Sequence, residues 1–292
     1  MADNPNLGPV IMGTLLTRDL TACMEAYETY LHAKVQRQAK ISDAQAAFWG
    51  TPNLAGCAYA VLVNELGEPF LRIVQDPNCA LVDTLKQTGW MALEIVVADV
   101  DAIAAGLDGS PFEVLRPVAD LSLSDQIRAV QVRGPAGEIL YLTQIKGAVP
   151  PFELPIAKCA VDKVFIPVLC THDRAKTLAF YEELSGNSGL SFDTKITVIN
   201  QAYGWDIDRN HPVATLQLKS NTLIEIDQVD AAKAPPANPI SGIMMVSFAV
   251  DELPQSSLAR DGLTKDCPSG TKRSMILRGV AGEMIELVQD IS

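Results

Sequence analysis

The sequence predicts an α+β protein built from four copies of a βαβββ module. Three repeated features support this: closing strands that end in Gln, a glycine turn before two of them, and an Asp at the start of each helix. The chain has 292 residues, of which 48% are apolar and 20% are charged. That profile is typical of a folded protein with room for two domains. The repeat places two modules in each half of the chain.

Each module is expected to begin with an apolar strand, followed by a helix that an Asp side chain caps. An Asp at this place accepts hydrogen bonds from first-turn amides, which have no partner within the helix. The opening strands and their Asp residues are 10–16 with Asp19, 91–97 with Asp99, 164–169 with Asp173 and 244–250 with Asp251. Two further strands are expected between each helix and the closing strand.

Each module is expected to end with a strand of alternating apolar residues, which places every second side chain on the same face. The four closing strands are Leu71–Gln75, Leu140–Gln144, Ile224–Gln228 and Ile285–Gln289. Before two of them the sequence repeats almost unchanged, as RGPAGE at 133–138 and RGVAGE at 278–283. Both copies are typical of a tight glycine turn between strands.

The two modules of each half are expected to pair, because one βαβββ unit leaves an apolar sheet face uncovered. Pairing curls the strands into an open cup with alternate side chains inside. The predicted domains are residues 1–146 and 161–292, joined by a Pro-rich linker at 147–160. Exchange of modules between two chains is the alternative.

The four modules resemble the vicinal oxygen chelate superfamily. The resemblance is carried by the helix signature from Asp173 to Phe180-Tyr181 and by the turn from Gly282 to Glu286. The superfamily includes glyoxalase I, bleomycin-resistance proteins, fosfomycin-resistance enzymes and extradiol dioxygenases. The resemblance covers nearly the whole chain and implies two glyoxalase-like domains, each a pair of curled sheets around a cup. The length and the module count are most similar to those of the two-domain dioxygenases.

The resemblance also implies where a divalent metal would bind, on the first and last strands of the modules. The corresponding positions are Met12, Arg72, Ala92 and Tyr141 in the first half, and Ile166, Glu225, Met245 and Glu286 in the second. The first set holds no usual ligand, and the second lacks the histidines of an iron-dependent dioxygenase. Nucleotide-binding motifs are absent from the sequence as well. We therefore expect no metal and no other cofactor.

The candidate catalytic residues are Glu225, Glu286 and His211. The two glutamates are expected to face each other in the second cup, where low dielectric and like charge raise one pKa and create a general acid or base. The alternative is that Arg273 or Arg278 on a neighbouring strand pairs with them. His211 begins a predicted strand and is expected near the mouth of the cup.

The candidate substrate-binding residues are Arg72, Tyr141, Met12, Ile166, Met245, Trp205 and Tyr203. Arg72 is expected inside the first cup. There its guanidinium either binds a carboxylate or enolate of the ligand, or pairs with Glu94 or Tyr141 within the protein. The two aromatic residues either form the wall of an aromatic-binding site or belong to the core.

Two classes of function fit these residues. The first is an isomerase or lyase that acts by proton transfer on a small apolar or aromatic oxygenated molecule. The second is a non-catalytic binding or sequestration protein of the bleomycin-resistance type, and a metal-dependent glyoxalase or dioxygenase-like enzyme is a further alternative. The halves differ in their cup residues, which favours the enzyme.

The composition limits the partners. A formal net charge of −12 argues against nucleic acid, because binding it needs clustered Lys and Arg. No apolar run approaches the roughly 20 residues that span a bilayer, and residues 1–5 do not resemble a signal peptide. We expect a small-molecule ligand, no nucleic-acid or membrane partner, a cytoplasmic location, and a monomer or homodimer. The six cysteines form no CxxC pair and are expected to be buried reduced thiols.

Overall fold

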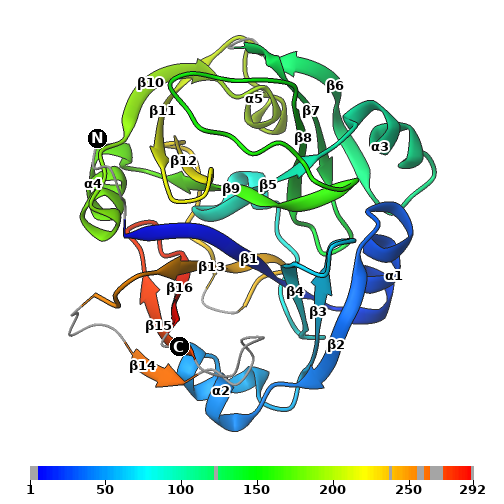
Figure 1. Cartoon of the computed structure of the whole chain (residues 1–292), viewed down its shortest axis with the longest axis vertical. Helices are drawn as coiled ribbons and strands as arrows, with labels where there is room; N and C mark the ends of the chain where they lie inside the picture. Colours follow the sequence, from blue (N-terminus) through cyan, green and yellow to red (C-terminus); the bar gives the residue numbers. More distant parts are fainter. Residues whose placement is uncertain (1–5, 122–123, 237–238, 255–259, 264–271, 291–292) are drawn as a thin grey trace.

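The computed structural model describes residues 6–121, 124–236, 239–254, 260–263 and 272–290. They form two curled sheets of eight strands each (Figure 1), which we call sheet 1 and sheet 2. The α+β class and the repeated modules are therefore confirmed.

Sheet 1 combines the first and the fourth module. Its strands, from one edge to the other, are β2 (Lys34–Lys40), β3 (Ala58–Val63), β4 (Pro69–Gln75), β1 (Leu7–Thr17), β13 (Gly242–Val250), β16 (Met284–Asp290), β15 (Lys272–Arg278) and β14 (Arg260–Leu263). The two modules meet where β1 runs antiparallel to β13, with Thr14 opposite Met245.

Sheet 2 combines the second and the third module. Its strands are β6 (Glu113–Leu121), β7 (Ser124–Arg133), β8 (Ile139–Ile145), β5 (Gly89–Val97), β9 (Val161–Thr171), β12 (Leu223–Gln228), β11 (Asn210–Gln217) and β10 (Leu190–Lys195). Here β5 runs antiparallel to β9, with Glu94 opposite Ile166.

The expected pairing of modules within each half is therefore wrong. All four opening strands are apolar and alternate in the same way, so the pattern identifies the face that each strand buries but not the strand beside it. The linker predicted at 147–160 does lack helix and strand, apart from an isolated bridge between Val149 and Phe152. It carries the chain from the closing strand of the second module to the opening strand of the third, inside the same sheet.

The helices follow the predicted pattern in three modules. They are α1 (Leu20–Tyr30), α3 (Val100–Gly106) and α4 (Arg174–Ser185), and two short helices, α2 (Asp43–Trp49) and α5 (Thr197–Tyr203), lie in the later parts of modules 1 and 3. The side chains of Asp19, Asp99 and Asp173 each accept a hydrogen bond from the first turn, as expected. The helix expected after Asp251 is not seen at 251–254, and 255–259 lie outside the described residues.

The repeated RGxAGE turn has a structural role. The Glu138 carboxyl group is fully buried, and it accepts hydrogen bonds from the Ala136 amide and, at 2.5 Å, from the Tyr27 hydroxyl of α1. A side chain at Gly134 would collide with that carboxyl group, which explains the glycine. Because α1 belongs to module 1 and the turn to module 2, this Tyr–Glu contact links the two sheets.

The second copy of the turn makes the same contact. Glu283 accepts hydrogen bonds from the Ala281 amide and, at 2.8 Å, from the Tyr181 hydroxyl of α4. Module 3 is thereby joined to module 4. Each half of the chain is thus held together by a Tyr–Glu contact, although each sheet is built from both halves.

Replacing Tyr27 by Phe is expected to lower the free energy of unfolding by about 1–3 kcal/mol, because the buried Glu138 loses a hydrogen-bond donor while little volume changes. Urea denaturation of the variant and the wild type measures the difference. Tyr30→Phe, on the same helix at a half-buried position, is the matched control and should change stability much less. Equal losses in the two variants would contradict a special role for the Tyr–Glu contact.

Two other expectations concern membranes and cysteines. Within the part of the chain that the structure describes, no helix is long and apolar enough to cross a bilayer. The five described cysteines are free thiols, and three of them, Cys23, Cys79 and Cys170, are buried. Cys267 lies outside the described residues.

Candidate active site

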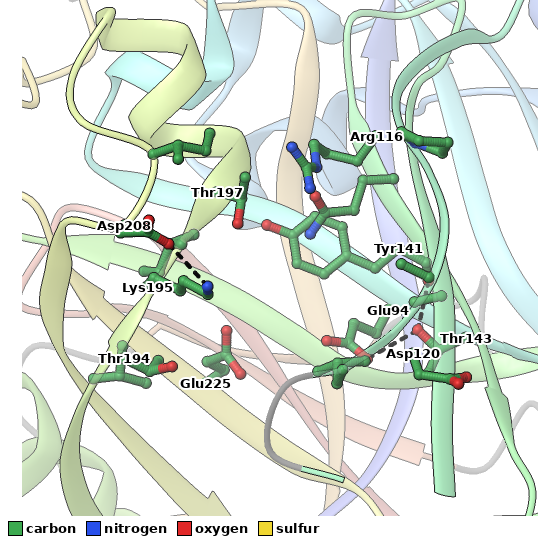
Figure 2. Close-up of a pocket in the computed structure, with 18 of the residues that line it drawn as sticks. Glu94, Arg116, Asp120, Tyr141, Thr143, Thr194, Lys195, Thr197, Asp208 and Glu225 are labelled. Carbon is green, nitrogen blue, oxygen red and sulfur yellow. Dashed lines mark hydrogen bonds and ion pairs between the residues drawn. The ribbon is translucent and has the colours of Figure 1, made fainter. Parts of the chain in front are cut away.

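Sheet 2 encloses a cavity of about 520 Å³ between module 2 and module 3. Figure 2 shows the side chains around it, which project from strands on both sides of the β5–β9 junction. The lining comes from three parts of sheet 2. Strands β5, β7, β8, β11 and β12 contribute Glu94, Gln131, Tyr141, Thr143, Val213 and Glu225, and strand β6 contributes Arg116, Ala119, Asp120 and Leu121. The opposite rim contributes Phe192, Lys195, Ile196, Thr197, Ile207 and Asp208. The size is ordinary for a small-molecule site.

Two glutamates face the cavity from different modules. Glu94 lies on β5 beside Tyr141 of β8, and Glu225 lies on β12 beside Val168 of β9. Their carboxyl groups approach each other across the lower part of the cavity in Figure 2. Glu94 also accepts a hydrogen bond of 3.2 Å from the Thr143 hydroxyl. Neither glutamate has a salt-bridge partner among the described residues.

The surroundings keep protons on these acids. Burial and the negative charge of Glu225 raise the pKa of Glu94 to about 8, and burial raises the pKa of Glu225 to about 7. Removal from water and like charge both disfavour the ionised form of a carboxylic acid. Near neutral pH the pair therefore holds about one proton, and the two groups titrate as a unit.

Two more polar groups lie against this pair. Asp227, two residues beyond Glu225 on the same face of β12, is fully buried, and neither carboxyl oxygen has a hydrogen-bond partner among the described residues. Burial, followed by the charges of Glu225 and Glu94, raises its pKa well above the ordinary value. The hydroxyl of Tyr141 also lacks a partner in the described part of the chain. In Figure 2 it points into the cavity toward Thr197, where a ligand oxygen can accept its hydrogen bond.

The exchange of modules redistributes the residues predicted for the two cups. Tyr141 and Glu225 line the same cavity, although the sequence placed them in different cups. Arg72 and Glu286 likewise meet in sheet 1, where Arg72 Nη1 lies 3.5 Å from Glu286 Oε2. Glu286 therefore does not face Glu225, and its prediction as a catalytic partner is wrong.

The Arg72–Glu286 pair is part of the core of sheet 1. The two side chains are 3% and 1% exposed, the Ser247 hydroxyl donates a 2.6 Å hydrogen bond to Glu286, and the Arg72 guanidinium lies 5.0 Å from the centre of the Trp49 ring. The partners weighed for Arg72 in the sequence were Glu94 and Tyr141. Its actual partner comes from the module at the far end of the chain.

The other predicted residues lie away from the described lining of the cavity. Met12 and Met245 are buried in sheet 1, and Ile166 is buried against the core of sheet 2. His211 is 3% exposed, and its Nε2 lies 2.7 Å from Asn200 Oδ1.

Two aromatic residues stack beside His211. Trp205 stacks on the His211 ring at 5.7 Å and on Tyr203 at 4.2 Å. Burial and the charge of Arg209 lower the pKa of His211, so it is a neutral structural side chain at physiological pH. These three residues lie at and beyond the end of α5 and are not among the residues that line the cavity.

Sequence reasoning missed Glu94 and Arg116 as site residues. Glu94 did carry a signal, since it is the one charged residue of the strand Gly89–Val97 and alternates with Ala92 on one face. A lone acid in a buried strand needs a partner or a function. Arg116 carried no such signal, because β6 is an edge strand with many exposed residues.

The donor set of the cavity does not suit the divalent metal that the resemblance implies. Glu94 and Glu225 supply two carboxyl groups from a first and a last strand, and the neighbouring positions hold Tyr141, Ala92 and Ile166. Among the described residues, no three His, Cys, Asp or Glu side chains are placed to hold an ion. Metal sites of this type use at least three such ligands.

The sequence matches no protein-family model and no curated protein. Its structure is similar to that of a glyoxalase I mutant from Zea mays, with a TM-score of 0.66 and 14% identity over 98% of this chain and 94% of that one. Unmutated glyoxalase I from Zea mays has a TM-score of 0.63 and 14% identity, over 96% and 92%. A proposed dioxygenase from Bacillus subtilis has a TM-score of 0.65 and 12% identity, over 100% and 87%.

These similarities extend over nearly the whole chain, whereas the identities are too low to carry over an activity. They confirm, at the level of the fold, the resemblance that the repeated modules carry. The chain thus has the fold of glyoxalase I from Zea mays over nearly its whole length.

Proposed function

We propose that the cavity of sheet 2 catalyses proton transfer, as an isomerase or lyase, on a small oxygenated molecule with an apolar body. The observation that carries the proposal is the pair formed by Glu94 and Glu225, two acids with raised pKa values in one cavity. A carboxyl group whose pKa lies near neutral pH is an effective general acid or base. The described residues offer this pair no cation that would fix its charge.

The two glutamates have complementary roles. Glu225, which has the lower pKa, is the group that is ionised first and serves as the base. It removes a proton from a carbon next to a carbonyl group, and the electron pair of the broken C–H bond moves into an enolate. Glu94, which keeps its proton to a higher pH, returns a proton to carbon or to a leaving group. The Tyr141 hydroxyl donates a hydrogen bond to the enolate oxygen.

The wall of the cavity supports this chemistry. Phe192, Ile196 and Val213 present apolar surface beside Glu225, so a ligand that fills the cavity displaces water from both acids. Removing water strengthens the hydrogen bond from Tyr141 to a developing negative charge. A ligand with an apolar body and one carbonyl group fits these surroundings.

Exchange of carbon-bound hydrogen with solvent tests the proposal without knowledge of the natural substrate. The wild type in D2O is expected to accelerate deuterium incorporation next to the carbonyl of 4-phenylbutan-2-one, followed by proton NMR. Glu225→Gln should lower the enzyme-dependent rate by about 100-fold, because Gln keeps the shape but cannot accept the proton. Glu94→Gln should also lower it.

The matched control is Glu25→Gln, at an exposed position on α1, which should leave the exchange rate unchanged. No acceleration by the wild type, or equal rates in the wild type and Glu225→Gln, would contradict proton transfer at this pair. Binding of the ketone without exchange would instead favour the non-catalytic binding protein.

A further inference from the structure

We infer that the substrate of this cavity carries a carboxylate, which Arg116 binds at the end of the cavity away from the two glutamates. The inference rests on the proposed function, since it identifies the class of molecule on which the pair would act. It assigns to Arg116 the role of a specificity-determining residue.

The charges along the cavity single out Arg116. The lining contains two cations, Arg116 and Lys195. Lys195 is already paired, with Nζ 3.0 Å from Asp208 Oδ1. Arg116 has no ion pair and no side-chain hydrogen bond within the described residues.

The nearby acid on the same strand is engaged elsewhere. Asp120 accepts hydrogen bonds from Lys146 at 3.0 Å and from Arg128 at 3.4 Å. Arg116 thus retains a free guanidinium, whose donors match the two oxygens of a carboxylate. In a chain of net charge −12, such a local cation is needed if the cavity is to attract an anion.

The strand register aligns Arg116 with the catalytic pair. Arg116 lies opposite Gln131, Gln131 opposite Tyr141, and Tyr141 opposite Glu94. The four side chains therefore form one row across β6, β7, β8 and β5, and all of them line the cavity. Three strand spacings separate the ends of the row, which is about 14 Å along the curved sheet.

The view in Figure 2 agrees with this order. Arg116 and Thr197 lie on one side of the Tyr141 ring, and Glu94 and Glu225 lie on the other. The Tyr141 hydroxyl, buried and without a partner among the described residues, lies between the two ends. A ligand that spans the cavity therefore meets a cation, then a hydrogen-bond donor, then the proton-transfer pair.

This order defines the class of substrate. It is an organic acid with a carboxylate at one end, an apolar or aromatic middle that packs on Phe192 and Ile207, and a carbonyl group at the other end. The two ends of the row are about 14 Å apart along the sheet, and the side chains that reach into the cavity from both ends shorten the span to that of one ring plus a short chain.

A pair of isosteric probes tests the inference by binding alone. 4-(3-Oxobutyl)benzoate carries the carboxylate, and 4-(3-oxobutyl)benzamide replaces it by a neutral amide of the same shape. Isothermal titration calorimetry should show that the wild type binds the benzoate about 10- to 100-fold more tightly than the benzamide, which is the range for a charge-assisted hydrogen bond. Arg116→Gln should remove that preference and leave the affinity for the benzamide unchanged.

The control is Arg273→Gln, at an exposed position in sheet 1, which changes the net charge by the same amount and should keep the preference. Equal affinities for the two probes in the wild type, or an unchanged preference in Arg116→Gln, would overturn the inference. Glu225→Gln separates it from the proposed function: that variant should keep the preference for benzoate while it loses hydrogen exchange. If hydrogen exchange depends on Glu225 but the wild type shows no preference for the benzoate, the proposed proton transfer is supported and the inference that the substrate carries a carboxylate is wrong.

Discussion

Replacing Arg72 by Met is expected to lower the free energy of unfolding by about 3–5 kcal/mol. The change leaves the Glu286 carboxylate in the core of sheet 1 without its counter-charge, at a site where both side chains are almost fully buried. Ser247 alone cannot replace the guanidinium, because one hydroxyl offers one donor. Urea denaturation at neutral pH measures the loss.

The double variant Arg72→Met with Glu286→Leu separates the ion pair from the packing. Most of the stability should return in the double variant, since a buried pair replaced by apolar groups of similar size is often nearly neutral. Arg128→Met, which removes a cation from exposed partners on the surface, should have little effect. A single variant that loses no more stability than the double variant would show that the pair does not hold the sheet together.

Lowering the pH from 8.5 to 5.5 is expected to stabilise the protein by several kcal/mol. The folded state holds protons on Glu94, Glu225 and Glu138, whose pKa values are raised from 4.5 to about 8, 7 and 7. The unfolded chain releases these protons above pH 4.5, so the stability that they contribute is present at low pH and is lost as the pH rises through 7 and 8. For the fully buried Glu138 alone, the gain between pH 8.5 and pH 5.5 is about 2 kcal/mol.

His211 works in the opposite direction. Its pKa is lowered in the folded state, so its contribution is present above pH 6.5 and is lost as the pH falls below that value. Three glutamates oppose this one histidine, so the free energy of unfolding should rise as the pH is lowered from 8.5 to 6.5. Urea denaturation at several pH values gives the curve.

The variants Glu94→Gln and Glu225→Gln sharpen this test. Each mimics the protonated acid, so each should be more stable than the wild type at pH 8.5 and close to it at pH 5.5. The substitutions that remove hydrogen exchange should therefore stabilise the fold, a relation found where an active site stores destabilising groups. A wild type whose stability falls when the pH is lowered from 8.5 to 6.5 would contradict the raised pKa values.

Several parts of the candidate site were predictable from the sequence. The parts that were not predictable share one cause. The alternation of the closing strands correctly directed Tyr141 and Glu225 into a cavity, because a period of two residues fixes the face of a strand. It gave no means of knowing that Glu225 would face Glu94 and that Glu286 would face Arg72. Those contacts depend on which modules share a sheet.

The repeated turn was visible in the sequence, but its role is structural and not chemical. RGPAGE and RGVAGE are the most similar segments of the two halves, yet their glutamates bind Tyr27 and Tyr181 and hold the modules together. A motif that recurs with little change at equivalent places in both halves serves the fold that the halves share. Among the residues that we assign to the cavity, Glu94 and Arg116 both lie in module 2, whereas Glu225 has a counterpart in Glu286 of module 4, which forms an ion pair with Arg72 instead.

The modules, the faces of their strands and the starts of three helices follow from the sequence alone, since these features depend on local hydrogen bonding and on a period of two residues within each strand. The pairing of module 1 with module 4, and of module 2 with module 3, becomes visible in the folded chain and not before. The edges of the opening strands offer the same backbone hydrogen bonds to any partner, so packing between segments far apart in the chain determines which strands pair. That choice placed two acids in one cavity and an ion pair in the other sheet.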